Sequence, residues 1–345
     1  MKQEIIGKVL YLLLAFVLIL GFHVGHAAGQ VKKVEWKIQS IYPPAGRSMH
    51  FLKEFAEKVE ERTGGNFRLK IFMPGQLVGV RELFGSVNKG MLDGAYAQMT
   101  FFSATVPVMD ARYGPYLAAN DKELAYLQLE TDYLKPVREE AAKHNILFVG
   151  AMTSQPGNLC SRKIVRTLAE FRGLKVRGGG VYSDIITAWS GSPVSVAPSE
   201  MYTALQYGTM DGVFYPLYAA VEYKFYEQLK CVVWPAPLTT SADFFVSMDS
   251  YNALPPAWQK VLIDSFMEKV KEYAATGDAY TKEQENYLAK HRVEVITWSE
   301  ADADMAKKLC MPIREKFRAA SPASAKVLAI AEKALEEYRK KHPSK

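Results

Sequence analysis

The chain has 345 residues, of which 49% are hydrophobic and 23% are charged. This is the balance of an ordinary globular protein, and it excludes a disordered or collagen-like chain. The net charge of +6 is small and scattered, so we expect no nucleic-acid partner. The length exceeds the usual size of one hydrophobic core, which predicts two domains.

The first 28 residues have the order of parts found in a secretory signal peptide. Lys2 and Lys8 precede an uncharged run at 9–22, and Gly25 and Ala27 fit a signal peptidase site. The run is short for a membrane-spanning helix, which needs about 20 apolar residues. We expect cleavage near residue 27 or 28 and a periplasmic protein that is not membrane-embedded. A retained membrane anchor is the alternative.

Strands and helices alternate along the first half of the remaining chain. The expected elements are a strand at 35–39, a helix carrying Phe51, Phe55 and Val59 that stops at Thr63–Gly65, a strand at 67–72, a helix at 81–89 and a strand at 92–98. Apolar residues recur every second position in the strands and every three to four positions in the helix. This order predicts a mostly parallel sheet flanked by helices.

The same alternation follows a long helical segment at 120–144. The expected elements are strands at 146–152, 174–177, 194–196 and 211–215, with helices at 168–171, 181–189 and 199–206 between them. The fold class is therefore α/β, with two units of similar architecture and no internal sequence repeat.

The last third of the sequence suggests how the two units are joined. A strand at 244–248 could return to the first sheet, and 255–291 predicts one helix of about 52 Å at 1.5 Å per residue, long enough to run along both units. We expect a bend at Gly277, because glycine weakens a helix interior. A strand at 292–298 and helices from Ser299 and Pro322 finish the chain. The predicted lobes are 29–153 plus about 242–280 (lobe I) and 154–241 plus about 281–345 (lobe II).

Motifs for catalysis and metal binding are missing from the sequence. It has no His-Glu-x-x-His, no zinc-type Cys/His spacing, no Gly-x-Ser-x-Gly and no P-loop. Gly178–Gly180 lacks the dinucleotide-binding spacing, so we interpret it as a place where a ligand or another backbone comes close. Cys160, Cys231 and Cys310 allow one disulfide or three buried thiols. We expect no enzyme activity, no metal and no cofactor.

Arg177 is the sharpest single feature. It ends the predicted strand at 174–177, and in open α/β sheets ligands bind beyond the carboxyl ends of strands. Its planar guanidinium matches a carboxylate with two hydrogen bonds. The alternative is a surface arginine at a strand end.

Several short motifs, taken in their order and spacing, resemble the substrate-binding receptors of tripartite ATP-independent periplasmic (TRAP) transporters, the DctP family. They are Phe55–Val59, Thr63–Gly65, Gly75–Leu77, Gly90–Asp93, Gly173–Arg177, Ser192–Pro193, Ser199–Gln206, Gly208, Met210–Gly212 and Lys224–Glu227. The resemblance spans about 35–300. It implies a two-lobed binding protein without catalysis, a ligand clamped between the lobes, and the small and large membrane subunits of a permease as partners. It also implies that Arg177 pairs with the ligand carboxylate.

The sequence departs from that family pattern where the ligand should bind. Many relatives carry a second arginine near Ser154–Asn158, where this chain has none, and aromatic Phe214–Tyr215 follows Gly212 where polar residues are common. We therefore expect a monocarboxylate with an aromatic or apolar body, because rings stack on aromatic faces. A small dicarboxylate, keto acid or sulfonate is the alternative ligand, and a ligand sensor for a membrane receptor is the alternative role. The candidate ligand-binding residues are Arg177, Tyr215, Gln98, Tyr42, Tyr218, Phe214, Gly180 and Trp234.

Overall fold

The computed structural model describes residues 33–44, 46–197 and 200–342. The predicted signal peptide lies outside these residues. Within them, no helix has both the length and the apolar character that crossing a membrane requires.

In the described part of the chain, nine strands form one mixed sheet in the order β2-β1-β3-β8-β4-β7-β5-β6, with β9 beside β8. Their bounds are β1 (Val34–Ser40), β2 (Phe67–Phe72), β3 (Gly94–Ala97), β4 (Ile146–Ser161), β5 (Lys175–Arg177), β6 (Ser192–Val194), β7 (Gly212–Pro216), β8 (Cys231–Ser247) and β9 (Glu294–Thr297). β1 pairs in parallel with β2 and β3, and β5 pairs in parallel with β6 and β7, as the alternating pattern predicted.

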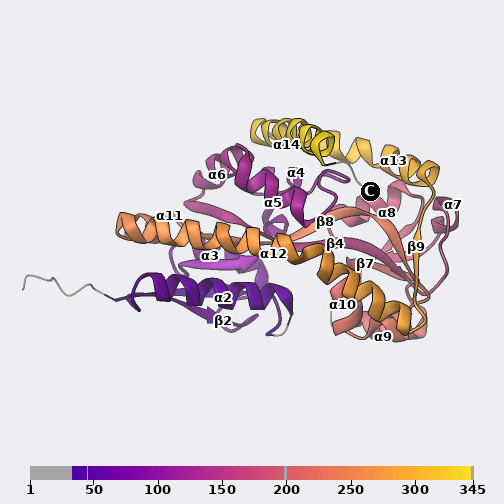
Figure 1. Cartoon of the computed structure of the whole chain (residues 1–345), viewed down its shortest axis with the longest axis horizontal. Coiled ribbons are helices and arrows are strands. Elements are labelled where there is room, and N and C mark those ends of the chain that lie inside the picture. The colour runs from indigo at the N-terminus through magenta and orange to yellow at the C-terminus, as the bar shows by residue number, and fades with distance from the viewer. Residues whose placement is uncertain (1–32, 45, 198–199, 343–345) are drawn as a thin grey trace, which may run out of the picture.

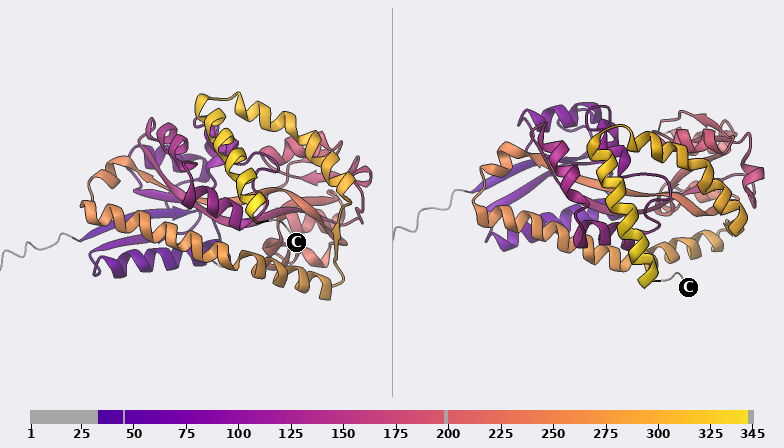
Figure 2. Two further views of the ribbon diagram at one scale, coloured as in Figure 1. Left: turned by 45° about the horizontal axis from the view of Figure 1, so that its top comes forward. Right: turned by 90° about the horizontal axis from the view of Figure 1, so that it is seen from above.

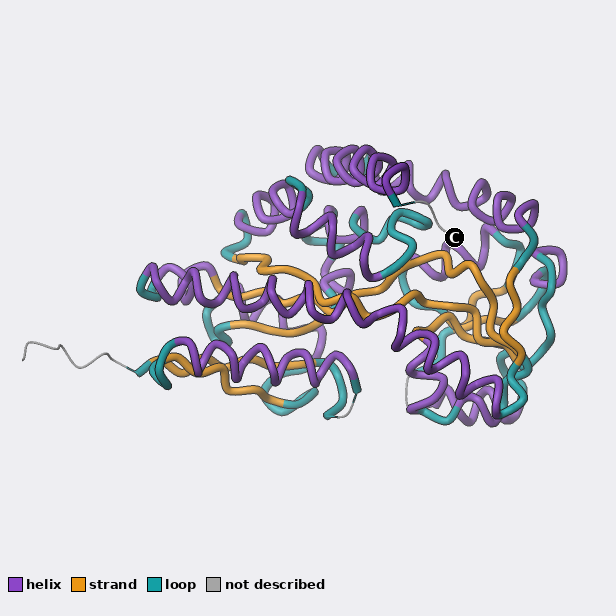
Figure 3. The backbone as a smooth tube through the Cα atoms, viewed as in Figure 1, coloured by secondary structure: helices purple, strands orange, loops and turns teal. Residues whose placement is uncertain are grey.

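The two longest strands, β4 and β8, belong to both lobes. They are antiparallel to each other along most of their length, and Figure 3 shows them running from one half of the molecule into the other. β8 borders β3 at one end, and β4 borders β7 at the other. The pairing slips between Thr153 and Pro156, at the predicted boundary between the lobes. The sequence predicted only the ends of these strands, at 146–152 and 244–248.

Helices cover both faces of the sheet. Their bounds are α2 (Arg47–Arg62), α3 (Leu83–Asn88), α4 (Val108–Ala111), α5 (Asp121–Glu130), α6 (Leu134–Ala142), α7 (Leu168–Phe171), α8 (Val181–Ala188), α9 (Met201–Tyr207), α10 (Leu217–Glu222), α11 (Met248–Asn252), α12 (Pro256–Lys290), α13 (Glu300–Arg318) and α14 (Pro322–Lys341). α2 and α12 share one hydrophobic cluster with the first lobe's sheet, and α9 and α10 share another with the second lobe's. A third cluster lies on the opposite face, beneath α6, α8, α13 and α14.

α12 is one unbroken helix that packs on both lobes, as predicted (Figure 1). Leu262, Phe266 and Val270 are buried against the first lobe, and Leu288 is buried against the second. Gly277 has a packing role that the sequence did not reveal. A Cβ at this position would come within 2.9 Å of the Cβ of Asp121, so glycine lets α12 pass close to the start of α5. The predicted bend at Gly277 stays a prediction.

The two C-terminal helices form a strap over one face of the molecule (Figure 2). α13 packs on α7 and α8 of the second lobe and also on α4 of the first, whereas α14 packs on α4, α5 and α6 of the first lobe. An ion pair of 2.6 Å between Arg339 and Glu123 also ties α14 to α5. The expected grouping of 281–345 with lobe II therefore does not match the packing of α14. An amphipathic pattern shows that a helix has an apolar face, but not which lobe that face covers.

All three cysteines are free and buried. Cys160 lies opposite Val232, and Cys231 lies opposite Ser161 on neighbouring strands. Because side chains alternate between the faces of a sheet, the two thiols point into different hydrophobic clusters. Burial raises the pKa of Cys231 to about 11 and that of Cys310 to about 12, so these thiols stay protonated at neutral pH.

Candidate ligand-binding cleft

A cavity of about 810 Å³ lies between the two lobes. It opens beyond the carboxyl ends of β1 and β3 in the first lobe and of β5 and β7 in the second, where ligands of open α/β sheets bind. Leu238, Thr240 and Ser241 of the shared strand β8 also line it. Its volume is within the range of small-molecule sites.

Seven of the eight candidate residues line this cavity. They are Arg177, Tyr215, Gln98, Tyr42, Tyr218, Phe214 and Gly180. Trp234 lies elsewhere, with its side chain against the hydrophobic cluster beneath α9 and α10. The alternation along β8 turns Val233 to one face of the sheet and Trp234 to the other. The sequence suggested Trp234 only because it precedes a proline-rich crossing between the lobes, and such a crossing does not fix the face.

Arg177 stands at the end of β5, half-buried, with few partners of its own. Its Nε donates a hydrogen bond of 3.4 Å to the carbonyl of Val196, and its Cζ lies 5.9 Å from the ring centre of Tyr215. No described carboxylate is within ion-pair distance of its guanidinium. The side chain is therefore held at the cavity wall while its positive charge remains available to an anion.

The glycines after Arg177 have two separate roles. A Cβ on Gly178 would lie 2.6 Å from the Cβ of Tyr182, so this glycine lets α8 pack closely against the end of β5. Gly180 has a φ of +57° as the residue that caps α8, a conformation that glycine adopts without strain. The sequence predicted that either a ligand or another part of the backbone comes close to these glycines. At Gly178 it is the helix α8 that comes close.

The cavity wall is rich in aromatic rings. The lining tyrosines are Tyr42, Tyr113, Tyr182, Tyr202, Tyr215, Tyr218 and Tyr223, and the phenylalanines are Phe101, Phe214 and Phe225. Tyr182 stacks on Phe214 with ring centres 5.1 Å apart. Burial raises the pKa of Tyr215, although Arg177 opposes this rise. Such hydroxyls remain neutral at physiological pH, so they offer hydrogen bonds and apolar faces together.

A buried ion pair supports the first-lobe side of the cavity. Arg112 and Asp243 lie 3.1 Å apart, with side chains only 1% and 0% exposed. Asp243 also accepts a hydrogen bond of 2.8 Å from the backbone of Met99, next to Gln98. Burial opposes the charge of Arg112, but Asp243 together with Tyr133 and Tyr113 outweighs burial and raises the pKa of the guanidinium. Tyr113 joins this network through a hydrogen bond with Ser241.

Sequence reasoning missed this network, because Arg112 and Asp243 are 131 residues apart and no local pattern connects them. It also missed Asp110, which lines the cavity from α4. None of the described residues form a group of three or more histidine, cysteine, aspartate or glutamate side chains that could hold a metal ion.

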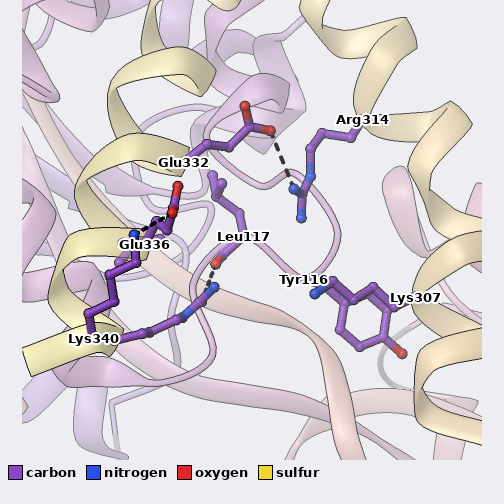
Figure 4. Close-up of a pocket in the computed structure, with 9 residues that line it drawn as sticks. Tyr116, Leu117, Lys307, Arg314, Glu332, Glu336 and Lys340 are labelled. Atoms are coloured by element: carbon purple, nitrogen blue, oxygen red, sulfur yellow. Dashed lines mark hydrogen bonds and ion pairs between the residues drawn. The ribbon is translucent and has the colours of Figure 1, made fainter. Parts of the chain in front are cut away.

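A second cavity, of about 460 Å³, lies between the C-terminal helices and the segment at Tyr116–Leu117 (Figure 4). Its charged side chains are largely paired with one another. Arg314 contacts Glu332 at 3.3 Å, and Lys340 contacts Glu336 at 2.6 Å. This cavity is a polar seam that joins the strap to the first lobe. Arg339 is paired with Glu123 outside the lining, and Lys307 has no ion pair with the described residues.

Comparison with known proteins agrees with this architecture. The profile of the bacterial extracellular solute-binding proteins, family 7 (DctP), matches residues 40–320. SiaP of Vibrio cholerae, a sialic acid-binding periplasmic protein, is 26% identical over 272 residues, covering 77% of this chain and 82% of SiaP. YiiZ of Salmonella typhimurium is 29% identical over 172 residues, and this match spans about half of each protein, 49% of this chain and 52% of YiiZ.

The fold is also that of solved structures. A TRAP periplasmic solute-binding protein from Desulfovibrio salexigens, solved with bound orotic acid, superposes with a TM-score of 0.79 at 23% identity and covers 88% of this chain and 99% of its own. Such proteins are two-lobed, as this chain is. With its shared central strands, its long helix across both lobes and a profile match over most of its length, the chain belongs to the DctP family of bacterial extracellular solute-binding proteins.

Proposed function

We propose that this protein is the periplasmic receptor of a TRAP transporter, which captures a small organic acid between its lobes and delivers it to the small and large membrane subunits of the permease. The observation that carries the proposal is Arg177, a half-buried guanidinium at the wall of the interlobe cavity with no carboxylate of the described chain paired to it. Two similar proteins bind acids: SiaP binds sialic acid, and the Desulfovibrio protein holds orotic acid.

The lining supports a ligand with one carboxylate and an aromatic or apolar body. Arg177 is the single arginine among the described lining residues, and ten aromatic side chains surround the same space. A flat or apolar body gains stacking and burial against these rings. A small dicarboxylate would need a second cationic partner, which the described lining does not provide.

The ligand is expected to close the two lobes about the shared strands, near residues 153 and 241. The pairing of β4 with β8 slips between Thr153 and Pro156, and interrupted pairing is a natural place for a hinge motion. Small-angle scattering with and without ligand should show a smaller radius of gyration in the bound state. An unchanged profile at saturating ligand would contradict closure.

The decisive experiment is to identify the bound molecule. Native mass spectrometry of protein purified from an envelope fraction, followed by release and fragmentation of any adduct, should reveal an organic acid. The same spectra give the mass of the mature protein, which tests cleavage near residue 27 or 28. A co-purified molecule without an acidic group would overturn the proposed ligand class, and a mature chain that retains the first 20 residues would overturn the proposed processing.

A further inference from the structure

The interlobe cavity contains a second charged group besides Arg177. Of the described residues that line it, Asp110 and Arg177 alone carry a charge. They come from different lobes, Asp110 from α4 in the first and Arg177 from the end of β5 in the second. An aromatic cavity with one fixed cation and one fixed anion is suited to a ligand that carries both charges.

Asp110 lacks a strong partner of its own. The hydroxyl of Ser103 donates a hydrogen bond to it, and no described lysine or arginine forms an ion pair with it. Lys316 acts on it only from a distance, because Lys316 is paired with Asp184 of α8 at 3.3 Å. Burial raises the pKa of Asp110, the Ser103 hydroxyl and Lys316 lower it, and Asp184 raises it further, so that burial dominates. Asp110 thus lines the cleft as a partly buried carboxylate without an ion-pair partner among the described residues.

We propose that Asp110 receives an ammonium group of the ligand, so that the receptor selects a zwitterion with an aromatic or apolar body. This inference rests on the proposed function, and it names the ligand more closely. Closure removes the remaining water from the cleft, and a buried carboxylate without a counter-charge is costly. A ligand ammonium removes that cost, and the surrounding tyrosine faces attract a cation as well. A second ligand carboxylate near Asp110 would be repelled, which disfavours the dicarboxylate alternative.

Two matched pairs of probes test the inference by titration calorimetry. L-phenylalanine is compared with 3-phenylpropionate, and 4-(aminomethyl)phenylacetate with 4-methylphenylacetate. The first pair places the two charges next to each other, and the second places a ring between them. In the wild type, at least one zwitterion should bind about tenfold or more tightly than its partner without the amino group, a difference typical of one well-formed charged contact.

The Asp110→Asn variant should remove this preference. The amide keeps the size of the side chain but not its charge, so the variant no longer buries an unpaired carboxylate when the cleft closes. The acid without an amino group should therefore bind at least as tightly as it does to the wild type, while the zwitterion loses its advantage. Asp304→Asn is the matched control, because Asp304 is an exposed carboxylate that does not line the cavity and, unlike Asp184, does not act on Asp110. This control should keep the preference, and thermal melting verifies that both variants fold.

Each result decides a different question. A preference that survives in Asp110→Asn, or a wild type that binds both members of each pair equally, would overturn the role of Asp110. If such binding still depended on Arg177, the proposed function would stand. Failure of all four probes to bind would overturn the aromatic or apolar ligand class and the zwitterion with it.

Discussion

Replacing Arg177 by alanine should weaken ligand binding by at least about a hundredfold, which is about 2.7 kcal/mol at 1.4 kcal/mol per decade. The estimate rests on two hydrogen bonds between the guanidinium and the ligand carboxylate, each of which contributes about 1.5–3 kcal/mol when charged. Their sum is at least about 3 kcal/mol. No second lining arginine of the described chain compensates, and the ligand carboxylate would be left buried and unpaired.

The same substitution should leave the fold intact. Arg177 contributes one long hydrogen bond, 3.4 Å to the carbonyl of Val196, and a contact with the ring of Tyr215. Losing these two contacts should change the free energy of unfolding only slightly, because the side chain is half-buried. Arg177→Lys should recover only part of the affinity, since an ammonium cannot make the two parallel hydrogen bonds that a planar guanidinium makes to one carboxylate.

Titration calorimetry with the co-purified acid measures the effect, and circular dichroism verifies folding. Arg172→Ala is the matched control, because Arg172 is an exposed arginine of the same lobe outside the cavity lining. It should bind like the wild type. A folded Arg177→Ala protein that binds within about threefold of wild type would refute the assignment of Arg177.

Three further predictions concern the scaffold. Gly277→Ala should cost about 1–3 kcal/mol of unfolding free energy, because the new methyl group meets Asp121; an unchanged urea midpoint would contradict this packing. Asp243→Ala should cost about 3–5 kcal/mol by leaving Arg112 buried without its partner, and a loss below about 1 kcal/mol in the same denaturation assay would show that the pair matters little. Burial raises the pKa of Asp121 from 3.8 to about 6, so the folded state holds a proton that the unfolded state releases. Wild type should therefore lose up to about 3 kcal/mol relative to Asp121→Asn as pH rises from about 4 to 6, with no further change above that; parallel stability curves for the two proteins would count against it.

Local sequence patterns predicted the parts of the fold that depend on local burial. The period-two strands, the helix with Phe51, Phe55 and Val59, and the unbroken helix at 256–290 follow from which side of each element is apolar. Arg177 could be placed at the end of its strand for the same reason, because the strand pattern before it and the glycines after it define where that strand ends.

Contacts between distant segments could not be predicted in this way. The slip between β4 and β8, the face of Trp234 and the packing of α14 depend on strand register and on which apolar surfaces meet in three dimensions. Asp110 carries no local signal, and its place in the cavity lining depends on the packing of α4 against α6, α13 and α14. Periodicity in a sequence reports that a side chain is buried. Which other side chain it contacts is decided by tertiary packing. The partners in pairs such as Arg112 and Asp243 are more than a hundred positions apart in the sequence, so no local pattern connects them.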